Sequence, residues 1–86
     1  MNEIIFDLDA FKEYLDWQLE DRKILTRINE LIIDIQRNGL MKGIGKPEPL
    51  KHIKAFSRRI DENNRLIYSA DEKHNLRIIS CKGHYK

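Results

Sequence analysis

The residues best suited to chemistry lie at the C-terminal end of the chain and in a proline-rich turn near its middle. The end of the chain contains a neighbouring imidazole and phenol, His84 and Tyr85. The turn places Glu48 between two prolines. Arg58, Arg59 and Arg65 lie between the two segments. A base, an acid, cations and an aromatic ring are the groups that cleavage of an RNA strand requires.

Cleavage of RNA through its own 2′-hydroxyl needs a base for the hydroxyl proton, cations for the phosphorane and an acid for the leaving 5′-oxygen. Glu48 is the strongest candidate for the base, because the prolines restrict its backbone and nearby lysines favour its ionised form. His84 is the candidate acid, since an imidazole can carry a proton near neutral pH. His52 and His74 are weaker candidates, because no predicted strand holds either of them. Taken alone, a glutamate in a turn or a terminal histidine is also typical of an ordinary surface.

The arginines and Tyr85 are the candidates for holding RNA. Arg58 and Arg59 are adjacent in a predicted strand, so their side chains should point to opposite faces and only one can serve the site. We expect the other to be structural and to pair with a carboxylate on a helix. The forked guanidinium of Arg65 matches phosphate oxygens. Tyr85 suits stacking on an unpaired base, and packing against the rim of the sheet is the alternative.

Length and composition predict one domain, residues 1–86, and exclude several classes of protein. No apolar run is long enough to cross a membrane, and the first residues do not resemble a signal peptide. The single cysteine, Cys81, excludes an intrachain disulfide and favours a cytoplasmic protein. We expect Cys81 to be a buried small residue and not a nucleophile. The cysteine and the scattered histidines provide no usual zinc spacing, so we expect no metal and no other cofactor.

Charge is unevenly distributed, although the formal net charge is only +2. Residues 1–21 are acidic apart from Lys12, whereas residues 42–59 are basic apart from Glu48. A polyanion would be drawn to the second region and repelled by the first. A solvated charged loop is the alternative interpretation of the basic region.

Hydrophobic periodicity predicts a strand at residues 4–6 followed by two helices. The first helix, capped by Asp7 or Asp9, has apolar residues at helical spacing: Leu8, Phe11, Leu15 and Leu19, with Tyr14 and Trp17 widening that face. After a polar break at 20–21, a second helix runs over 22–38 and ends at Gly39. Its apolar residues are Ile24, Leu25, Ile28, Leu31, Ile32 and Ile35. The helices should form an antiparallel hairpin.

Residues 39–50 should form a loop, because they hold three glycines and both prolines. Three strands follow at 55–60, 66–70 and 76–82, and short turns between them predict an antiparallel meander. The order indicates an α+β fold with the helices on one face of the sheet. Arg65 should point to the other face, which is left free for a ligand, and the third strand should carry His84 to the sheet edge.

Six segments of the chain match a known family. They are Tyr14–Gln18, Ile28–Ile32, Gly45–Lys51, Ser57–Ile60, Arg65–Tyr68 and His84–Tyr85. On these segments the chain resembles the YoeB/Txe toxins of the RelE/ParE superfamily of bacterial toxin–antitoxin systems, nearly end to end. The motif Gly-Lys-Pro-Glu-Pro-Leu-Lys at 45–51, together with the terminal His-Tyr, is the most specific part of the resemblance.

The resemblance implies a microbial-ribonuclease-like (RelE-like) fold of order β-α-α-β-β-β. It also implies a ribosome-dependent endoribonuclease that cleaves mRNA in the A site, inhibits translation and needs no metal. The family's catalytic residues correspond to Glu48, Arg65 and His84, and its substrate-binding residues to Lys51, Arg59 and Tyr85. The implied partners are the ribosome, mRNA and an antitoxin whose disordered acidic C-terminal segment covers the toxin. Operator DNA would be reached only through the antitoxin, and members of the family tend to form homodimers.

Two alternatives use the same scaffold differently. A ParE-like toxin would inhibit DNA gyrase without cutting RNA, and it would need no base and acid such as Glu48 and His84. A non-catalytic RNA-binding module would keep the arginines and Tyr85 but would tolerate loss of Glu48. The chain departs from its relatives in a shorter 53–55 segment, in Ser57 at a position where tryptophan is common, and in the additional Lys86. None of these departures removes a catalytic candidate.

Overall fold

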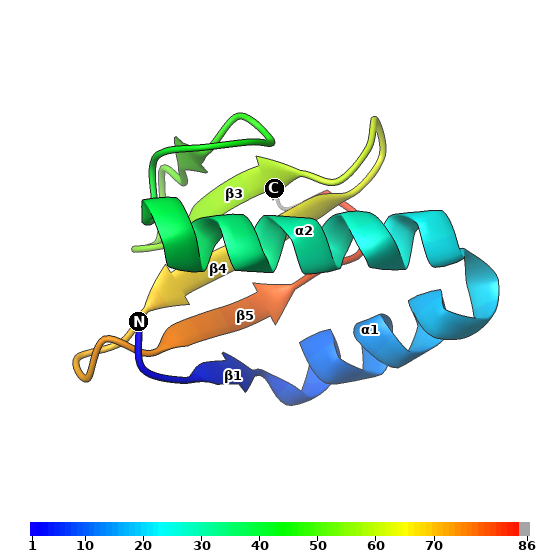
Figure 1. The fold of residues 1–86 in the computed structure, drawn as a ribbon, viewed down its shortest axis with the longest axis horizontal. Helices are drawn as coiled ribbons and strands as arrows, with labels where there is room; N and C mark the ends of the chain where they lie inside the picture. Colours follow the sequence, from blue (N-terminus) through cyan, green and yellow to red (C-terminus); the bar gives the residue numbers. More distant parts are fainter. Residues whose placement is uncertain (85–86) are drawn as a thin grey trace.

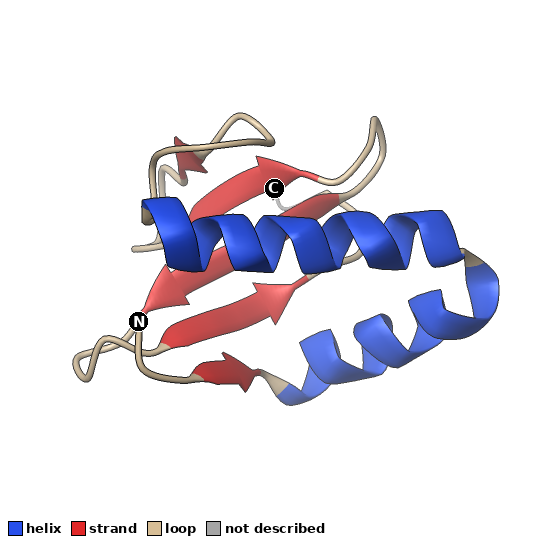
Figure 2. Cartoon of the chain, viewed as in Figure 1, coloured by secondary structure: helices blue, strands red, loops and turns tan. Residues whose placement is uncertain are grey.

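The computed structural model of the chain describes residues 1–84, which fold into two helices and a five-stranded sheet (Figures 1 and 2). The elements are β1 (Ile4–Phe6), α1 (Leu8–Glu20), α2 (Arg22–Asn38), β2 (Glu48–Pro49), β3 (Phe56–Arg59), β4 (Arg65–Ala70) and β5 (Leu76–Ser80). The strand order is β1-β5-β4-β3-β2. β1 runs parallel to β5, and the other neighbouring strands are antiparallel. The α+β class and the mainly antiparallel sheet are confirmed, and the element order agrees with the prediction apart from the additional strand β2.

The prediction of a loop over residues 39–50 was wrong at its end, where the structure contains β2. Glu48 pairs with Ser57 and Pro49 pairs with Phe56, so this two-residue strand forms one edge of the sheet. An edge position suits Pro49, which has no N–H to donate. The strand is too short to produce a periodic pattern, and its prolines are typical of a loop. β1 has its predicted bounds, and β3, β4 and β5 differ from theirs by one or two residues at their ends.

The main core lies between α2 and the sheet. The residues of α2 that the periodicity placed inward are buried or half-buried, and Ile28, Leu31 and Ile35 are fully excluded from solvent. They belong to one cluster with Leu66 of β4 and Ile78 of β5. Figure 1 shows α2 lying across the strands. Tyr68 and Trp17 are also buried in this cluster.

The sequence prediction for the inner face of α1 was wrong at its leucines and Phe11, whereas Tyr14 and Trp17 of that face pack into the core as predicted. Leu8 and Leu19 are 69% and 91% exposed, and Phe11 and Leu15 are also exposed, whereas Ala10 and Trp17 are buried. The helix is rotated because the Trp17 indole N–H donates to the carbonyl of Cys81, 2.9 Å away. The spacing of apolar residues in the sequence contains no sign of this hydrogen bond. Asp7 precedes the helix without a side-chain cap, because its carboxylate pairs with Arg77 at 2.8 Å.

Over the described residues, neither helix has both the length and the apolar character that a bilayer crossing requires.

Candidate active site

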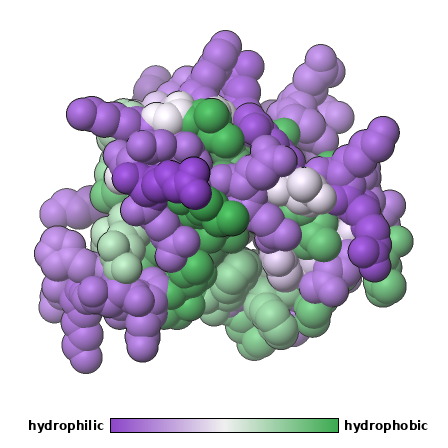
Figure 3. Space-filling model, in the orientation of Figure 1, coloured by the Kyte–Doolittle hydropathy of each residue, from purple (hydrophilic) through white to green (hydrophobic). Residues whose placement is uncertain are grey.

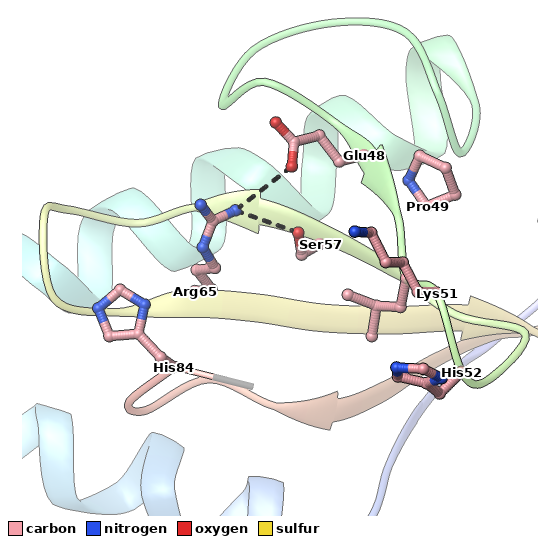
Figure 4. A pocket seen from close by; sticks show the side chains of 8 residues that line it. Glu48, Pro49, Lys51, His52, Ser57, Arg65 and His84 are labelled. Carbon is pink, nitrogen blue, oxygen red and sulfur yellow. Dashed lines mark hydrogen bonds and ion pairs between the residues drawn. The ribbon is translucent and has the colours of Figure 1, made fainter. Parts of the chain in front are cut away.

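Glu48 reaches the sheet through β2, where its backbone pairs with that of Ser57. Its side chain is 57% exposed, and its carboxylate Oε2 lies 4.0 Å from Nη1 of Arg65. Lys46, two residues earlier, has a φ of 52°, a left-handed conformation that is uncommon for a residue with a side chain. The strained turn and the following proline direct the chain into β2, and so place Glu48 over the sheet (Figure 4).

Arg65 is held at the start of β4 by a second contact. Its Nη1 donates a hydrogen bond to Ser57 Oγ at 3.2 Å, and Ser57 is only 2% exposed. The sequence analysis did not assign Ser57 to the site. The signal was its position two residues before Arg59 in a predicted strand, which puts both side chains on the face opposite Arg58. The hydroxyl and Glu48 together restrict the guanidinium of Arg65.

His84 follows β5 and is placed by hydrogen bonds of the residue before it. The backbone N–H of Arg65 donates to the Gly83 carbonyl at 3.0 Å, and the Gly83 N–H donates to Asn64 Oδ1 at 2.8 Å. Gly83 has a φ of 81°, which suits a residue without a side chain. The chain end is therefore attached to the start of β4 immediately before His84. The strand that was predicted over residues 76–82 ends at Ser80 in the structure, so these hydrogen bonds, and not the strand, place His84.

One open cavity of ≈ 530 Å³ brings most of the candidate residues together on the face of the sheet opposite the helices (Figure 4). Its lining is Glu48, Pro49, Leu50, Lys51, His52, Ser57, Arg65 and His84. His52, which the sequence analysis ranked low, lies in this cavity, whereas His74 lies in the turn before β5. Tyr85 lies outside the described residues.

Arg59 lines a second cavity of ≈ 490 Å³ that shares Arg65 and His84 with the first. Arg59 and Arg65 are partners in the pairing of β3 with β4, so two guanidinium groups lie on neighbouring strands. Like charges at such positions repel each other, and a phosphate between them would relieve the repulsion. Arg27 of α2 also lines this second cavity, and the sequence analysis did not assign it to the site.

Arg58 points the other way and is structural, as the alternation of the strand predicted. Its side chain is fully buried and pairs with Asp34 of α2 at 2.5 Å. The expectation that one of the two adjacent arginines pairs with a helix carboxylate is confirmed.

The arrangement offers a carboxylate, cations and an imidazole to one bound molecule. Cys81 cannot supply a nucleophile, because it is buried and burial raises the pKa of its thiol to about 12. Over residues 1–84, no group of three or more histidine, cysteine, aspartate or glutamate side chains is arranged to hold a metal ion. The chemistry that these side chains can perform is acid–base catalysis with electrostatic stabilisation of an anion.

Comparisons with known proteins agree with this fold. A family model described as a YoeB-like toxin of a bacterial type II toxin–antitoxin system matches residues 6–85. Toxin YoeB of Escherichia coli (strain K12) is 44% identical over 84 residues, which cover 95% of this chain and 98% of that protein. In the solved YoeB–YefM complex from Staphylococcus aureus, a chain with 45% identity superposes with a TM-score of 0.88 and coverage of 96% and 97%. A YoeB dimer from Staphylococcus aureus gives a TM-score of 0.89 at 44% identity, with the same coverage. The fold expected from the resemblance is confirmed.

Proposed function

This chain belongs to the YoeB-like toxins of bacterial type II toxin–antitoxin systems, and we propose that it is an endoribonuclease that cleaves mRNA in the ribosomal A site. The observation that carries the proposal is that Glu48, Arg65 and His84 line one cavity although they come from three separate segments. Such a set of side chains matches the needs of cleavage through the 2′-hydroxyl. A toxin that only bound gyrase would not require it.

In the proposed reaction, Glu48 accepts the proton of the 2′-hydroxyl as that oxygen attacks the phosphorus. The bond from phosphorus to the 5′-oxygen breaks, and His84 donates a proton to the leaving oxygen. The products are a 2′,3′-cyclic phosphate and a free 5′-hydroxyl, so atoms and protons balance. Arg65, with Lys51 and Arg59, stabilises the negative charge that develops on the phosphorane. Tyr85 stacks on a base of the message.

Assemblies of the solved relatives indicate which partners this chain would have. The relatives from Staphylococcus aureus include a YoeB–YefM complex and a YoeB dimer. By analogy, this chain would bind an antitoxin, form homodimers and reach operator DNA only through the antitoxin. Ribosome and mRNA would be its targets in the cytoplasm.

The test is cleavage of a defined message on translating ribosomes by the purified protein. Glu48→Gln and His84→Gln should each lower the single-turnover rate by about 10²-fold or more, because each removes one proton-transfer group. Binding to the ribosome should persist in both variants. A separate assay of DNA gyrase activity in the presence of the purified protein tests the alternative function, which predicts inhibition of gyrase and no cleavage of RNA.

The product ends provide an independent check of the mechanism. They should carry a 2′,3′-cyclic phosphate or a 3′-phosphate, and 3′-hydroxyl ends would rule the mechanism out. Near-parental rates in both variants would remove Glu48 and His84 from their assigned roles. The variant Glu72→Gln serves as a control, since it changes an exposed glutamate that lines neither of the two cavities.

A further inference from the structure

The buried guanidinium of Arg58 forms hydrogen bonds with all of its N–H donors. Nε donates to the Tyr68 hydroxyl at 2.9 Å. Nη1 donates to Asp34 Oδ2 at 2.5 Å and to the Ile44 carbonyl at 3.0 Å. Nη2 donates to the carbonyls of Gly39 and Lys42 at 2.8 and 2.7 Å. A guanidinium has five N–H donors, so none is left over for solvent or substrate.

Most partners of Arg58 belong to the loop between α2 and β2. Besides the three carbonyls bound by Arg58, the Tyr68 hydroxyl donates to the Leu40 carbonyl at 2.5 Å. The Ile44 N–H donates to Asp34 Oδ2 at 3.0 Å. Five backbone groups of residues 39–44 are therefore hydrogen-bonded to three side chains. We call these side chains, Asp34, Arg58 and Tyr68, the loop hub.

The loop approaches the hub so closely that a side chain cannot be added at one position. Gly43 has a φ of 117°, and a Cβ built there would lie 1.8 Å from Asp34 Oδ2. The geometry of the loop is thus adapted to the carboxylate.

The pKa values of Asp34 and Tyr68 both favour permanent hydrogen bonds within the hub. Burial would raise the pKa of Asp34, but hydrogen bonds from Arg58 and the Ile44 N–H outweigh it and hold the pKa below its ordinary value. Burial raises the pKa of Tyr68, so its hydroxyl keeps the proton that it donates to Leu40. The hub is fully satisfied, as a buried polar network must be if it is to fix one conformation.

The path from the hub to Glu48 is short. The Arg59 N–H donates to the Gly45 carbonyl at 2.7 Å, which attaches the loop to β3 immediately after the hub. Lys46 and Pro47 then lead into β2, which is only two residues long. A strand of this length cannot fix its own position, because it contributes few ladder bonds. The position of Glu48 therefore depends on the segments beside β2. These are the loop before it and Leu50 after it, whose N–H donates to the Ala55 carbonyl at 2.9 Å.

We propose that Asp34, Arg58 and Tyr68 are positioning residues that set Glu48 against Arg65 by holding loop 39–45 from the opposite face of the sheet. The proposal rests on the proposed function, in which Glu48 is the base. Displacement of a reacting group by about 1 Å can lower a rate by about 10²-fold even when the mutation is remote. Loosening the hub should then lower the rate of the chemical step while contacts with the ribosome remain.

The decisive variant is Tyr68→Phe, which keeps the buried ring and removes the hydroxyl that joins Arg58 to Leu40. Its single-turnover rate at saturating ribosomes should fall by about tenfold or more, with the concentration for half-saturation unchanged within about twofold. Asp34→Asn should have the same effect or a larger one. Ile28→Val, on the buried face of α2, is a control: it should lower stability about as much as Tyr68→Phe does, and it leaves the hub unchanged. Arg77→Met removes the exposed ion pair with Asp7 at the far side of the sheet. Both controls should cleave at the parental rate.

Hydrogen exchange provides a second measurement that does not depend on RNA cleavage. In Tyr68→Phe, the N–H groups of Ile44 and Arg59 should exchange faster, whereas those of α2 should not change. Faster exchange together with a lower rate supports the proposal. A parental rate, or a loss no larger than that of Ile28→Val, overturns it. If the parent protein cuts no message at all, the proposed function is wrong. Hydrogen exchange still tests the hub in that case, because unchanged exchange of the Ile44 and Arg59 N–H groups in Tyr68→Phe would show that the hub does not hold the loop.

Discussion

Arg65 is held in place before any substrate arrives. Ser57 Oγ accepts from its Nη1, and the carboxylate of Glu48 lies 4.0 Å from the same atom. Its side chain is only 22% exposed, so a phosphate meets a guanidinium that has already lost much of its freedom. Preorganised charge of this kind is most effective where negative charge develops during the reaction.

We therefore predict that Arg65→Ala lowers the single-turnover rate of cleavage far more than it weakens ribosome binding, by about 10²-fold against about threefold. Arg65→Lys should recover little, because an ammonium group cannot contact Ser57 and a phosphate with the forked geometry of a guanidinium. Rates and binding are measured separately, by quenched single-turnover cleavage and by co-sedimentation with ribosomes. Arg37→Ala, on the exposed last turn of α2, is the control. Parental activity of Arg65→Lys would contradict the assignment.

Chemical type was sufficient to choose Glu48 and His84 from the sequence, whereas the family resemblance selected Arg65 among the candidate arginines; the structure places all three in one cavity. Their catalytic roles stay predictions. Ser57 could not be chosen by chemical type, because its only signal was its position two residues before Arg59 in a predicted strand. Its importance arises from the register that sets Arg59 opposite Arg65 and Ser57 opposite Ile67. That register depends on the turn at residues 60–64, whose hydrogen bonds the sequence does not specify uniquely.

Helix α1 supports the segment that leads to His84. The Trp17 indole donates to the Cys81 carbonyl at 2.9 Å, and Glu13 accepts from the Cys81 N–H at 2.8 Å. Lys82 pairs with Glu20 at 3.0 Å and lies 4.8 Å from the centre of the Trp17 ring. Consecutive residues after β5 are thus bound to one helix.

From these contacts we predict that Trp17→Phe destabilises the fold by about 1–3 kcal/mol, since it leaves a buried carbonyl without its donor. It should also lower cleavage, because the segment before His84 is less firmly held. Urea denaturation and single-turnover cleavage measure the two effects. Leu19→Ala on the same helix should change neither, because Leu19 is 91% exposed. A stable Trp17→Phe protein with parental cleavage would show that α1 does not hold this segment.

Periodicity predicted α2 and its buried face, but for α1 it predicted the helix and only part of the buried face. The difference is that the inward face of α2 is mostly apolar, whereas α1 is oriented by hydrogen bonds of Trp17 and Glu13 to Cys81, 64 and 68 positions away. Such long-range polar contacts leave no local pattern. β2 escaped prediction for a related reason, since its pairing with β3 is imposed by the loop before it.

The basic residues and the apolar groove of the molecule lie on different sides. Lys46, Lys51, Lys54 and Arg59 are exposed around the cavities, whereas Arg58 is neutralised by Asp34. On the other side, a cavity of ≈ 430 Å³ lies between β1, α1 and α2, lined mainly by apolar residues that include Phe11 and Ile33. Figure 3 shows apolar surface gathered between hydrophilic side chains on this side of the molecule. A basic face and a separate apolar groove suit a ligand that is itself both acidic and apolar.

We predict that a small acidic protein with a disordered C-terminal tail silences this toxin. Carboxylates of the tail should pair with Arg59 or Arg65, and its apolar residues should fill the groove beside Phe11. Such a tail is disordered when free and becomes ordered on binding. Mixing the toxin with the product of the adjacent reading frame should give a tight complex, an increase in helical or strand content by circular dichroism, and loss of RNA cleavage.

Two variants separate the contributions of charge and apolar contact to this complex. Arg59→Glu should slow association and make it less dependent on salt, whereas Phe11→Ala should mainly speed dissociation, each weakening binding by about tenfold. Leu19→Ala, on the exposed part of α1 outside the groove, is the matched control. Truncating the acidic tail of the partner should restore cleavage, because the tail is what covers the cations of the catalytic cavity. If the intact partner binds and cleavage continues undiminished, the partner acts elsewhere and inhibition by coverage of the active site is wrong.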